Sequence, residues 1–163
     1  MLSEDEIDRT KTVCFSGHRT EKLPLFCQTE EGKRIMLSFI AAAADECIKA
    51  GYNTFIAGGA RGIDIWAALI IAGIKADRPD AGIKLITAVP YRNQSAALTG
   101  KELFDYGFAL AQSDLVIFLS DDYTKDCHKR RNRFMVDHSS KLIAVLSDPR
   151  SGTAQTVRMA RES

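Results

Sequence analysis

Short, uninterrupted apolar runs alternate with segments of helical periodicity along nearly all of this 163-residue chain. An apolar run without polar alternation is typical of a strand covered on both of its faces, so each run predicts a buried strand. Strands joined by helices pack as parallel neighbours through right-handed crossovers. The alternation therefore predicts an α/β fold and excludes all-helical and antiparallel all-β architectures.

The predicted elements have clear bounds. Five strands are expected at residues 12–16, 53–57, 83–89, 115–119 and 142–146. Helices are expected at residues 33–50, 65–74, 101–112, 126–139 and 152–161. The helix at 65–74 is apolar almost all round, which predicts a deeply buried position. Together these elements predict a three-layer Rossmann-like sandwich with a mainly parallel five-stranded sheet.

Length and charge limit the choice further. The length predicts a single Rossmann-like domain over residues 1–163, with residues 1–10 as a flexible or peripheral N-terminus. Lys and Arg number 22 and Asp and Glu 21, which gives a formal net charge of +1. This balance excludes a protein that works mainly by coating itself in nucleic acid or anionic lipid. It leaves room for a local basic site.

The sequence predicts a cytoplasmic protein with no membrane partner. Its first residues are acidic and polar, unlike a secretory signal, and residues 65–74 are too short an apolar stretch to cross a bilayer. The four cysteines form no C-x-x-C pair and are typical of reduced thiols. Cys127, His128 and His138 do not have the spacing of a structural zinc site, so we expect no metal.

Ligands of open α/β sheets bind beyond the carboxyl ends of the strands, where the strand order switches. The first strand is followed by Gly17, His18 and Arg19. This segment either supplies donors for an anion or is an ordinary turn with an exposed His and Arg. The second strand is followed by Gly58, Gly59, Ala60, Arg61, Gly62 and, shortly after, Asp64. Three glycines before a helix favour a close approach to phosphate; the alternative is a tight turn with Asp64 as the helix N-cap.

The remaining strand ends carry weaker signals. Tyr91 and Arg92 follow the third strand and either stack on a base or belong to an ordinary loop. The fourth strand is followed by Ser120, Asp121, Asp122 and Tyr123. Its carboxylates either hold ribose hydroxyls, act as an acid/base pair, or open a turn. Gly152 and Thr153 precede the last helix, as a second phosphate cradle or as an N-cap loop.

The densest charge run lies near the start of the fourth predicted helix. It comprises Lys125, Lys129, Arg130, Arg131 and Arg133. A solvated basic face is one explanation. Cations near a helix start are disfavoured by the helix dipole, which favours a function for some of them, either in contacting an anion or in lining a nucleic-acid groove.

Several segments taken in order resemble the YpsA family of uncharacterised bacterial proteins, which belongs to the SLOG (Smf/DprA–LOG) superfamily. They are FSGHR, FIAGGARGID, VIFLS, RNRFMVDHS and a late SGT, and the resemblance runs from about Lys11 onward. It implies a Rossmann-like fold and recognition of nucleotides or their derivatives. LOG enzymes cleave the N-glycosidic bond of a nucleoside monophosphate. Here Asn132 stands where their motif has a lysine, and Thr156 stands where it has the catalytic glutamate.

These signals predict a bacterial, cytoplasmic nucleotide-binding protein, with an NAD- or ADP-ribose-type ligand, acting as a sensor or regulatory protein. One alternative is a nucleotide or ADP-ribose N-glycosidase, with Asp121, Asp122 and Arg131 as catalytic candidates. Another is single-stranded nucleic-acid binding of the DprA type, and a homo-oligomer is a further candidate assembly. The predicted ligand-binding residues are Gly17, His18, Arg19, Gly58, Gly59, Ala60, Arg61, Gly62, Asp64, Tyr91, Arg92, Ser120, Asp121, Tyr123, Arg131, Asn132, Gly152 and Thr153.

Overall fold

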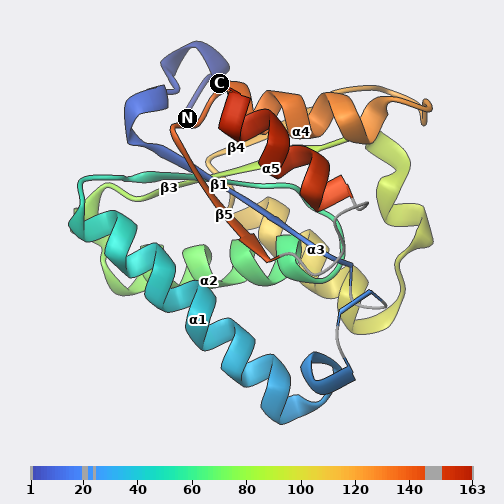
Figure 1. The fold of residues 1–163 in the computed structure, drawn as a ribbon, viewed down its shortest axis with the longest axis horizontal. Helices are drawn as coiled ribbons and strands as arrows, with labels where there is room; N and C mark the ends of the chain where they lie inside the picture. Colours follow the sequence, from blue (N-terminus) through green and yellow to red (C-terminus); the bar gives the residue numbers. More distant parts are fainter. Residues whose placement is uncertain (1, 20–21, 24, 146–151, 163) are drawn as a thin grey trace.

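A five-stranded sheet with all strands parallel forms the centre of the molecule (Figure 1). The computed structural model describes residues 2–19, 22–23, 25–145 and 152–162. The strands are β1 (Thr12–Gly17), β2 (Thr54–Ala57), β3 (Lys84–Val89), β4 (Leu115–Phe118) and β5 (Lys141–Val145). Their order across the sheet is β4-β3-β2-β1-β5. The predicted α/β class is confirmed; Leu146, at the end of the fifth predicted strand, lies outside the described residues.

Helices cover both faces of the sheet. On one face lie α1 (Glu30–Lys49), α2 (Ile63–Asp77) and α3 (Gly100–Gln112). On the other lie α4 (Cys127–Asp137) and α5 (Gly152–Glu162) (Figure 1). The chain adds strands in one direction from β1 to β4 and then returns to place β5 beside β1. The strand order therefore switches between β1 and β5, where this fold class binds ligands.

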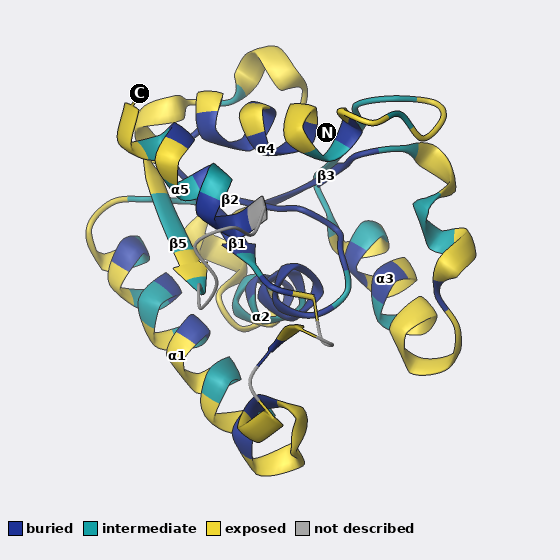
Figure 2. Ribbon diagram, turned by 45° about the vertical axis from the view of Figure 1, so that its right-hand side comes forward, coloured by how far each residue is buried: buried dark blue, intermediate teal, exposed yellow. Residues whose placement is uncertain are grey.

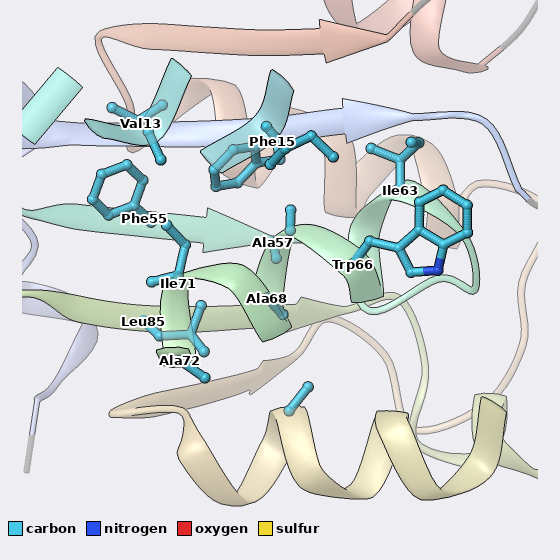
Figure 3. Packing of buried hydrophobic residues seen from close by; sticks show 14 of the residues in the cluster. Val13, Phe15, Phe55, Ala57, Ile63, Trp66, Ala68, Ile71, Ala72 and Leu85 are labelled. Carbon is cyan, nitrogen blue, oxygen red and sulfur yellow. The ribbon is translucent and has the colours of Figure 1, made fainter. Parts of the chain in front are cut away.

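The core is built around α2, as the apolar character of that helix predicts. Phe15 of β1 and Phe55 of β2 lie with ring centroids 6.0 Å apart and pack on the α2 side of the sheet (Figure 3). On the other face, Cys14 and Ile56 pack with Met135 of α4. Figure 2 shows α2 as a mostly buried helix between α1 and α3. Because both faces are covered, the strands need no polar alternation.

Local capping explains a difference at α1. The helix begins at Glu30, three residues before the predicted start, because the Thr29 hydroxyl accepts a hydrogen bond from the Gly32 amide at 3.0 Å.

The N-terminal residues before β1 contact the rest of the fold. Leu2 and Ile7 pack against the apolar cluster that contains Phe134 and Met135 of α4. In addition, Arg9 Nε donates to the carbonyl oxygen of Asp137 at 3.2 Å.

None of the described helices is both long and apolar enough to cross a membrane.

Candidate functional site

A cavity of about 190 Å³ lies at the switch in strand order and is called the inner cavity below. It is lined by residues from the ends of β1 and β2 and from α2, α4 and α5. These are Ser16, Gly17, His18, Arg19, Lys22, Ala60, Asp64, His128, Arg131, Asn132 and Thr153. Segments far apart in the sequence meet here because the carboxyl ends of parallel strands share one edge of the sheet.

A buried ion pair forms the floor of the inner cavity. Arg131 reaches over the strand ends from α4, Asp64 reaches from α2 on the opposite face, and Nη1 lies 3.7 Å from Oδ2. Arg131 Nη1 also donates to the carbonyl oxygen of Gly58, and its Nε donates to Asn132 Oδ1 at 2.8 Å. Asp64 Oδ2 accepts from the Ala60 amide at 3.3 Å. The pair thereby joins both helical layers to the loop after β2.

Burial shifts the pKa of each partner in the direction of its uncharged form. Burial raises the pKa of Asp64 above its usual range, and the charge of Arg131 acts in the opposite direction. Burial also lowers the pKa of Arg131, which the charge of Asp64 opposes. Each partner therefore supports the ionised form of the other in a place where water does not.

The interpretation of Asp64 as a helix N-cap is wrong. Helix α2 begins at Ile63 with Gly62 as its N-cap residue, so Asp64 lies within the first turn. Its carboxylate faces Arg131 and the Ala60 amide instead of capping the helix. A tertiary partner thus takes the acceptor that a local cap would have used.

The glycines after β2 have reasons within the fold. A Cβ at Gly58 would lie 2.6 Å from both Arg131 Nη1 and Asp64 Oδ2, too close for either atom. Gly62 has a φ of +93°, which favours glycine. Packing against the ion pair and the sharp entry into α2 therefore require these glycines, whether or not the loop contacts phosphate.

Arg19 and Lys22 supply positive charge at the inner cavity. Both are exposed, whereas Arg131 is balanced by Asp64 in the floor. Thr153, in the first turn of α5, is 5% exposed and brings a hydroxyl group to the wall. Ala60, which also lines the cavity, precedes the N-terminus of α2, where the helix dipole is positive. This combination of cations, hydroxyl group and dipole suits a small anion.

A second cavity, of about 350 Å³, adjoins the first and is called the outer cavity. Arg19, Ala60 and His128 line both cavities. The outer cavity is completed by Arg61, Tyr91, Gln94, Ala97, Leu98 and Tyr123. The two cavities together extend along the carboxyl edge of the sheet from the side of β5 toward β4.

Three rings meet at the outer cavity. The centroid of Tyr91 lies 5.5 Å from that of Tyr123 and 6.2 Å from that of His128, and the Tyr123 and His128 centroids are 6.4 Å apart. Burial, followed by the positive charges of Arg131 and Arg19, lowers the pKa of His128 from 6.5 to about 4. At neutral pH the His128 ring therefore adds no positive charge to the cluster.

Several predicted residues lie outside both cavities. Arg92 Nε is 2.8 Å from Asp121 Oδ1 in an exposed ion pair, with the guanidinium over the ring of Phe118. The hydroxyl group of Ser120 donates to the carbonyl oxygen of Asp122 at 2.6 Å. The other predicted residues that line neither cavity are Gly58, Gly59, Gly62 and Gly152. Of these, Gly58 lies against the ion pair and Gly152 begins α5.

The basic run of α4 divides between two faces. Arg131 is buried at the inner cavity, together with its neighbour Asn132. Lys129, Arg130 and Arg133 are exposed and line neither cavity. Arg130 Nη2 donates to the carbonyl oxygen of Leu119 at 2.9 Å.

Sequence reasoning missed Ser16, Lys22, Gln94, Ala97, Leu98 and His128 among the lining residues. His128 had a usable signal, because it precedes Arg131 by three positions and so shares its helix face. Gln94 had none. It lies in a 3₁₀ segment, Arg92–Ala97, several residues beyond the end of β3.

Comparison with known proteins places the chain among its relatives. The sequence profile of the YpsA family, described as the YspA SLOG family, matches residues 13–162. A UPF0398 protein of Bacillus thuringiensis (strain Al Hakam) is 24% identical over 153 residues, which cover 90% of this chain and 80% of that protein. UPF0398 protein BCAH187_A1726 of Bacillus cereus (strain AH187) has the same identity and coverage.

Two solved structures share the fold. DNA processing protein A (DprA) from Streptococcus pneumoniae matches with a TM-score of 0.54 and 16% identity, over 93% of this chain and 48% of that one. DprA from Helicobacter pylori, described with a single-stranded DNA binding mode, matches with a TM-score of 0.57 and 18% identity, over 92% of this chain and 61% of that one. This chain thus spans less than two thirds of either DprA chain. Because the family profile covers nearly its whole length, the chain belongs to the YpsA family of SLOG proteins.

Proposed function

We propose that the protein binds a nucleotide or a nucleotide derivative of the NAD or ADP-ribose type, with a phosphate group in the inner cavity. The observation that carries the proposal is the composition of that cavity, where the exposed cations Arg19 and Lys22 lie with the Thr153 hydroxyl group near the start of α2. Membership of a SLOG family supports a nucleotide as the source of the phosphate. We further propose a sensor or regulatory role.

The charge distribution favours a small ligand over a polyanion. The net charge is +1, and Arg131 in the floor is paired with Asp64. The positive charge left at the inner cavity is therefore local, as one or two phosphate groups require.

Ligand-induced stabilisation tests the proposal. A ligand that binds the native state raises the melting temperature as its concentration rises, by about 2.7 kcal/mol of stability at 100 times Kd. We expect this rise with at least one of AMP, NAD and ADP-ribose at millimolar concentration. Arg19→Ala should reduce it, whereas Arg34→Ala, at an exposed arginine of α1, should leave it unchanged. No stabilisation by any of the three would contradict the proposal.

Single-stranded DNA binding is a second candidate, favoured by the exposed Lys129, Arg130 and Arg133 on α4 and by the fold shared with DprA. Such binding weakens steeply with salt, by a slope of about −0.7 per phosphate contact in a log–log plot. Fluorescence anisotropy of a labelled oligonucleotide should show this slope. The double variant Lys129→Glu/Arg133→Glu should abolish DNA binding without changing nucleotide binding, because neither residue lines the inner or the outer cavity. Binding that is absent or insensitive to salt would eliminate this candidate.

The glycosidase alternative lacks comparable support among the described residues. Asp121 and Asp122 lie outside both cavities. Thr156, at the position of the LOG glutamate, is completely buried and has no carboxylate to stabilise an oxocarbenium-like centre.

A further inference from the structure

We propose that the outer cavity is a nucleobase subsite that selects adenine. In this arrangement the rings of Tyr91, Tyr123 and His128 hold the base, and the side-chain amide of Gln94 recognises its exocyclic amine. The inference rests on the proposed function, because the inner cavity must hold a phosphate group of the same ligand.

The ring cluster provides a surface for a flat, apolar ligand. Tyr91 stands nearly perpendicular to both other rings, at 83° to Tyr123 and 84° to His128. The cavity therefore presents ring faces in more than one plane, and Leu98 and Ala97 add aliphatic surface. Base stacking on aromatic side chains accepts any base, so the rings explain binding but not selection.

Gln94 supplies the selective contact. Its Oε1 is shielded from water and has no hydrogen-bond partner among the described residues, although Gln94 lines the outer cavity. Such an unpaired acceptor is unfavourable, and the terminal torsion of a glutamine is soft enough to turn the amide toward a ligand. The backbone N–H of Gln94 donates to the carbonyl oxygen of Tyr91 at 3.2 Å, which holds the backbone of Gln94 close to that of Tyr91.

The side-chain amide of Gln94 can form two hydrogen bonds with adenine, one as acceptor and one as donor. Oε1 can accept from the N6 amine of adenine while Nε2 donates to N7. Guanine and hypoxanthine present an oxygen where adenine has its amine, so Oε1 would face a second acceptor. If the amide turns so that Nε2 donates to that oxygen, Oε1 faces N7, which is also an acceptor. An acceptor that requires a donor therefore rejects these bases.

The shared wall fits the geometry of one ligand. Arg19, Ala60 and His128 line both cavities, so a phosphate group in the inner cavity and a base in the outer cavity would lie against the same three residues. His128 is uncharged at neutral pH, which allows its ring to pack against the sugar or the base without bringing a third positive charge beside Arg19 and Arg131.

Calorimetric titration of the full chain with four probes tests the inference. The probes are AMP, inosine monophosphate, CMP and ribose 5-phosphate. We expect AMP to bind about tenfold or more tightly than inosine monophosphate, because the two differ only in the group at C6 and the proton at N1. AMP should also bind more tightly than CMP, whose smaller base stacks less, and than ribose 5-phosphate, which has no base.

Substitutions at Gln94 and Tyr91, with one control, assign the effect to residues. Gln94→Leu should abolish the difference between AMP and inosine monophosphate while leaving ribose 5-phosphate binding unchanged. Gln112→Leu, at an exposed glutamine at the end of α3, is the matched control and should alter nothing. Tyr91→Ala should weaken AMP about tenfold, and Tyr91→Phe should retain most of the affinity because the ring remains.

The outcomes separate this inference from the proposed function. Equal affinity for AMP and ribose 5-phosphate would overturn the base subsite while phosphate binding stands. Binding of inosine monophosphate or CMP as tight as that of AMP, or a discrimination that Gln94→Leu does not change, would overturn the choice of adenine. Failure of all four probes at millimolar concentration would overturn this inference, and the proposed function would fall with it only if NAD and ADP-ribose also failed to stabilise the protein.

Discussion

Two arginine–aspartate pairs lie at the same edge of the sheet and differ in almost everything except chemistry. In the inner pair, Arg131 and Asp64 have side chains that are 8% and 5% exposed. In the outer pair, Arg92 and Asp121 are 62% and 85% exposed. The outer pair has the shorter distance, 2.8 Å against 3.7 Å, yet water screens it. We therefore expect the stability of the fold to depend more on the buried pair than on the exposed pair, although the exposed pair has the shorter distance.

The inner pair also has more neighbours that depend on it. Arg131 holds the carbonyl oxygen of Gly58, and Asp64 holds the amide of Ala60, so the loop after β2 is fixed at two points. The outer pair joins two exposed segments, one after β3 and one after β4. The inner pair is therefore part of the candidate site, whereas the outer pair lies outside both cavities.

Removing half of the inner pair should have the largest effect. Arg131→Leu leaves the Asp64 carboxylate buried without its cation, which should lower the free energy of unfolding by about 3–5 kcal/mol. Urea denaturation measures this loss. Adding Asp64→Leu should restore part of the stability, because the stranded charge is then gone. A loss below about 1 kcal/mol for the single variant would contradict the role assigned to burial.

Crowding the inner pair should have the next largest effect. Gly58→Ala places a methyl group against Arg131 and Asp64, and should cost about 1–3 kcal/mol of stability. Gly73→Ala is the control, because nothing lies within 4 Å of a Cβ at that helical position. The control should be neutral or stabilising by up to about 1 kcal/mol. Equal effects of the two substitutions in urea denaturation would show that the side chains of Arg131 and Asp64 can move aside at little cost, and would contradict the prediction.

Acid should weaken the inner region through His128. Its pKa is about 4 in the fold and 6.5 as its ordinary value, so between these values the unfolded chain binds a proton that the native chain does not. Stability should therefore fall as pH decreases from about 6.5 to about 4, by about 1–2 kcal/mol for a side chain that is only partly buried. His128→Phe should remove this part of the slope in urea denaturation at several pH values. An unchanged slope in the variant would contradict the assignment.

Breaking the outer pair should have the smallest effect. Arg92→Ala and Asp121→Ala should each change stability by less than about 0.5 kcal/mol, and a double-mutant cycle should give a coupling energy of the same size. Both variants should bind nucleotide like the original chain, because neither side chain lines the inner or the outer cavity. A coupling energy as large as that of the inner pair would contradict the conclusion that burial makes the inner pair more important for stability.

The order of elements was predictable because a strand buried on both faces is an uninterrupted apolar run in the sequence. Every predicted strand and helix appears with small changes at its ends, since an apolar run needs no knowledge of its neighbours to be recognised. The same locality made the strand ends accessible as candidate positions. Thr29 shows the limit, because its cap extended α1 beyond the apolar periodicity.

Roles that depend on distant partners were not predictable. Asp64 looked like a helix cap because its nearest sequence neighbours suit one, whereas its partner Arg131 comes from the opposite layer of the sheet. Arg131 was predicted as a ligand-binding residue and lines the inner cavity, but nothing in its basic run indicated that it alone among the arginines there is buried. Gln94 acquires its environment only when the loops after β3 and β4 come together.

The pairing of β1 with β5 has a consequence for the order of events during synthesis. These neighbours come from near opposite ends of the sequence, with Val13 beside Lys141 and Gly17 beside Val145. Contacts of such high sequence separation form late, and a ribosome releases β5 long after β1. A nascent chain must therefore keep the β1 edge open until β5 has been made. The inner cavity, which Thr153 of α5 lines, is complete only after that strand and the following helix have packed on the sheet.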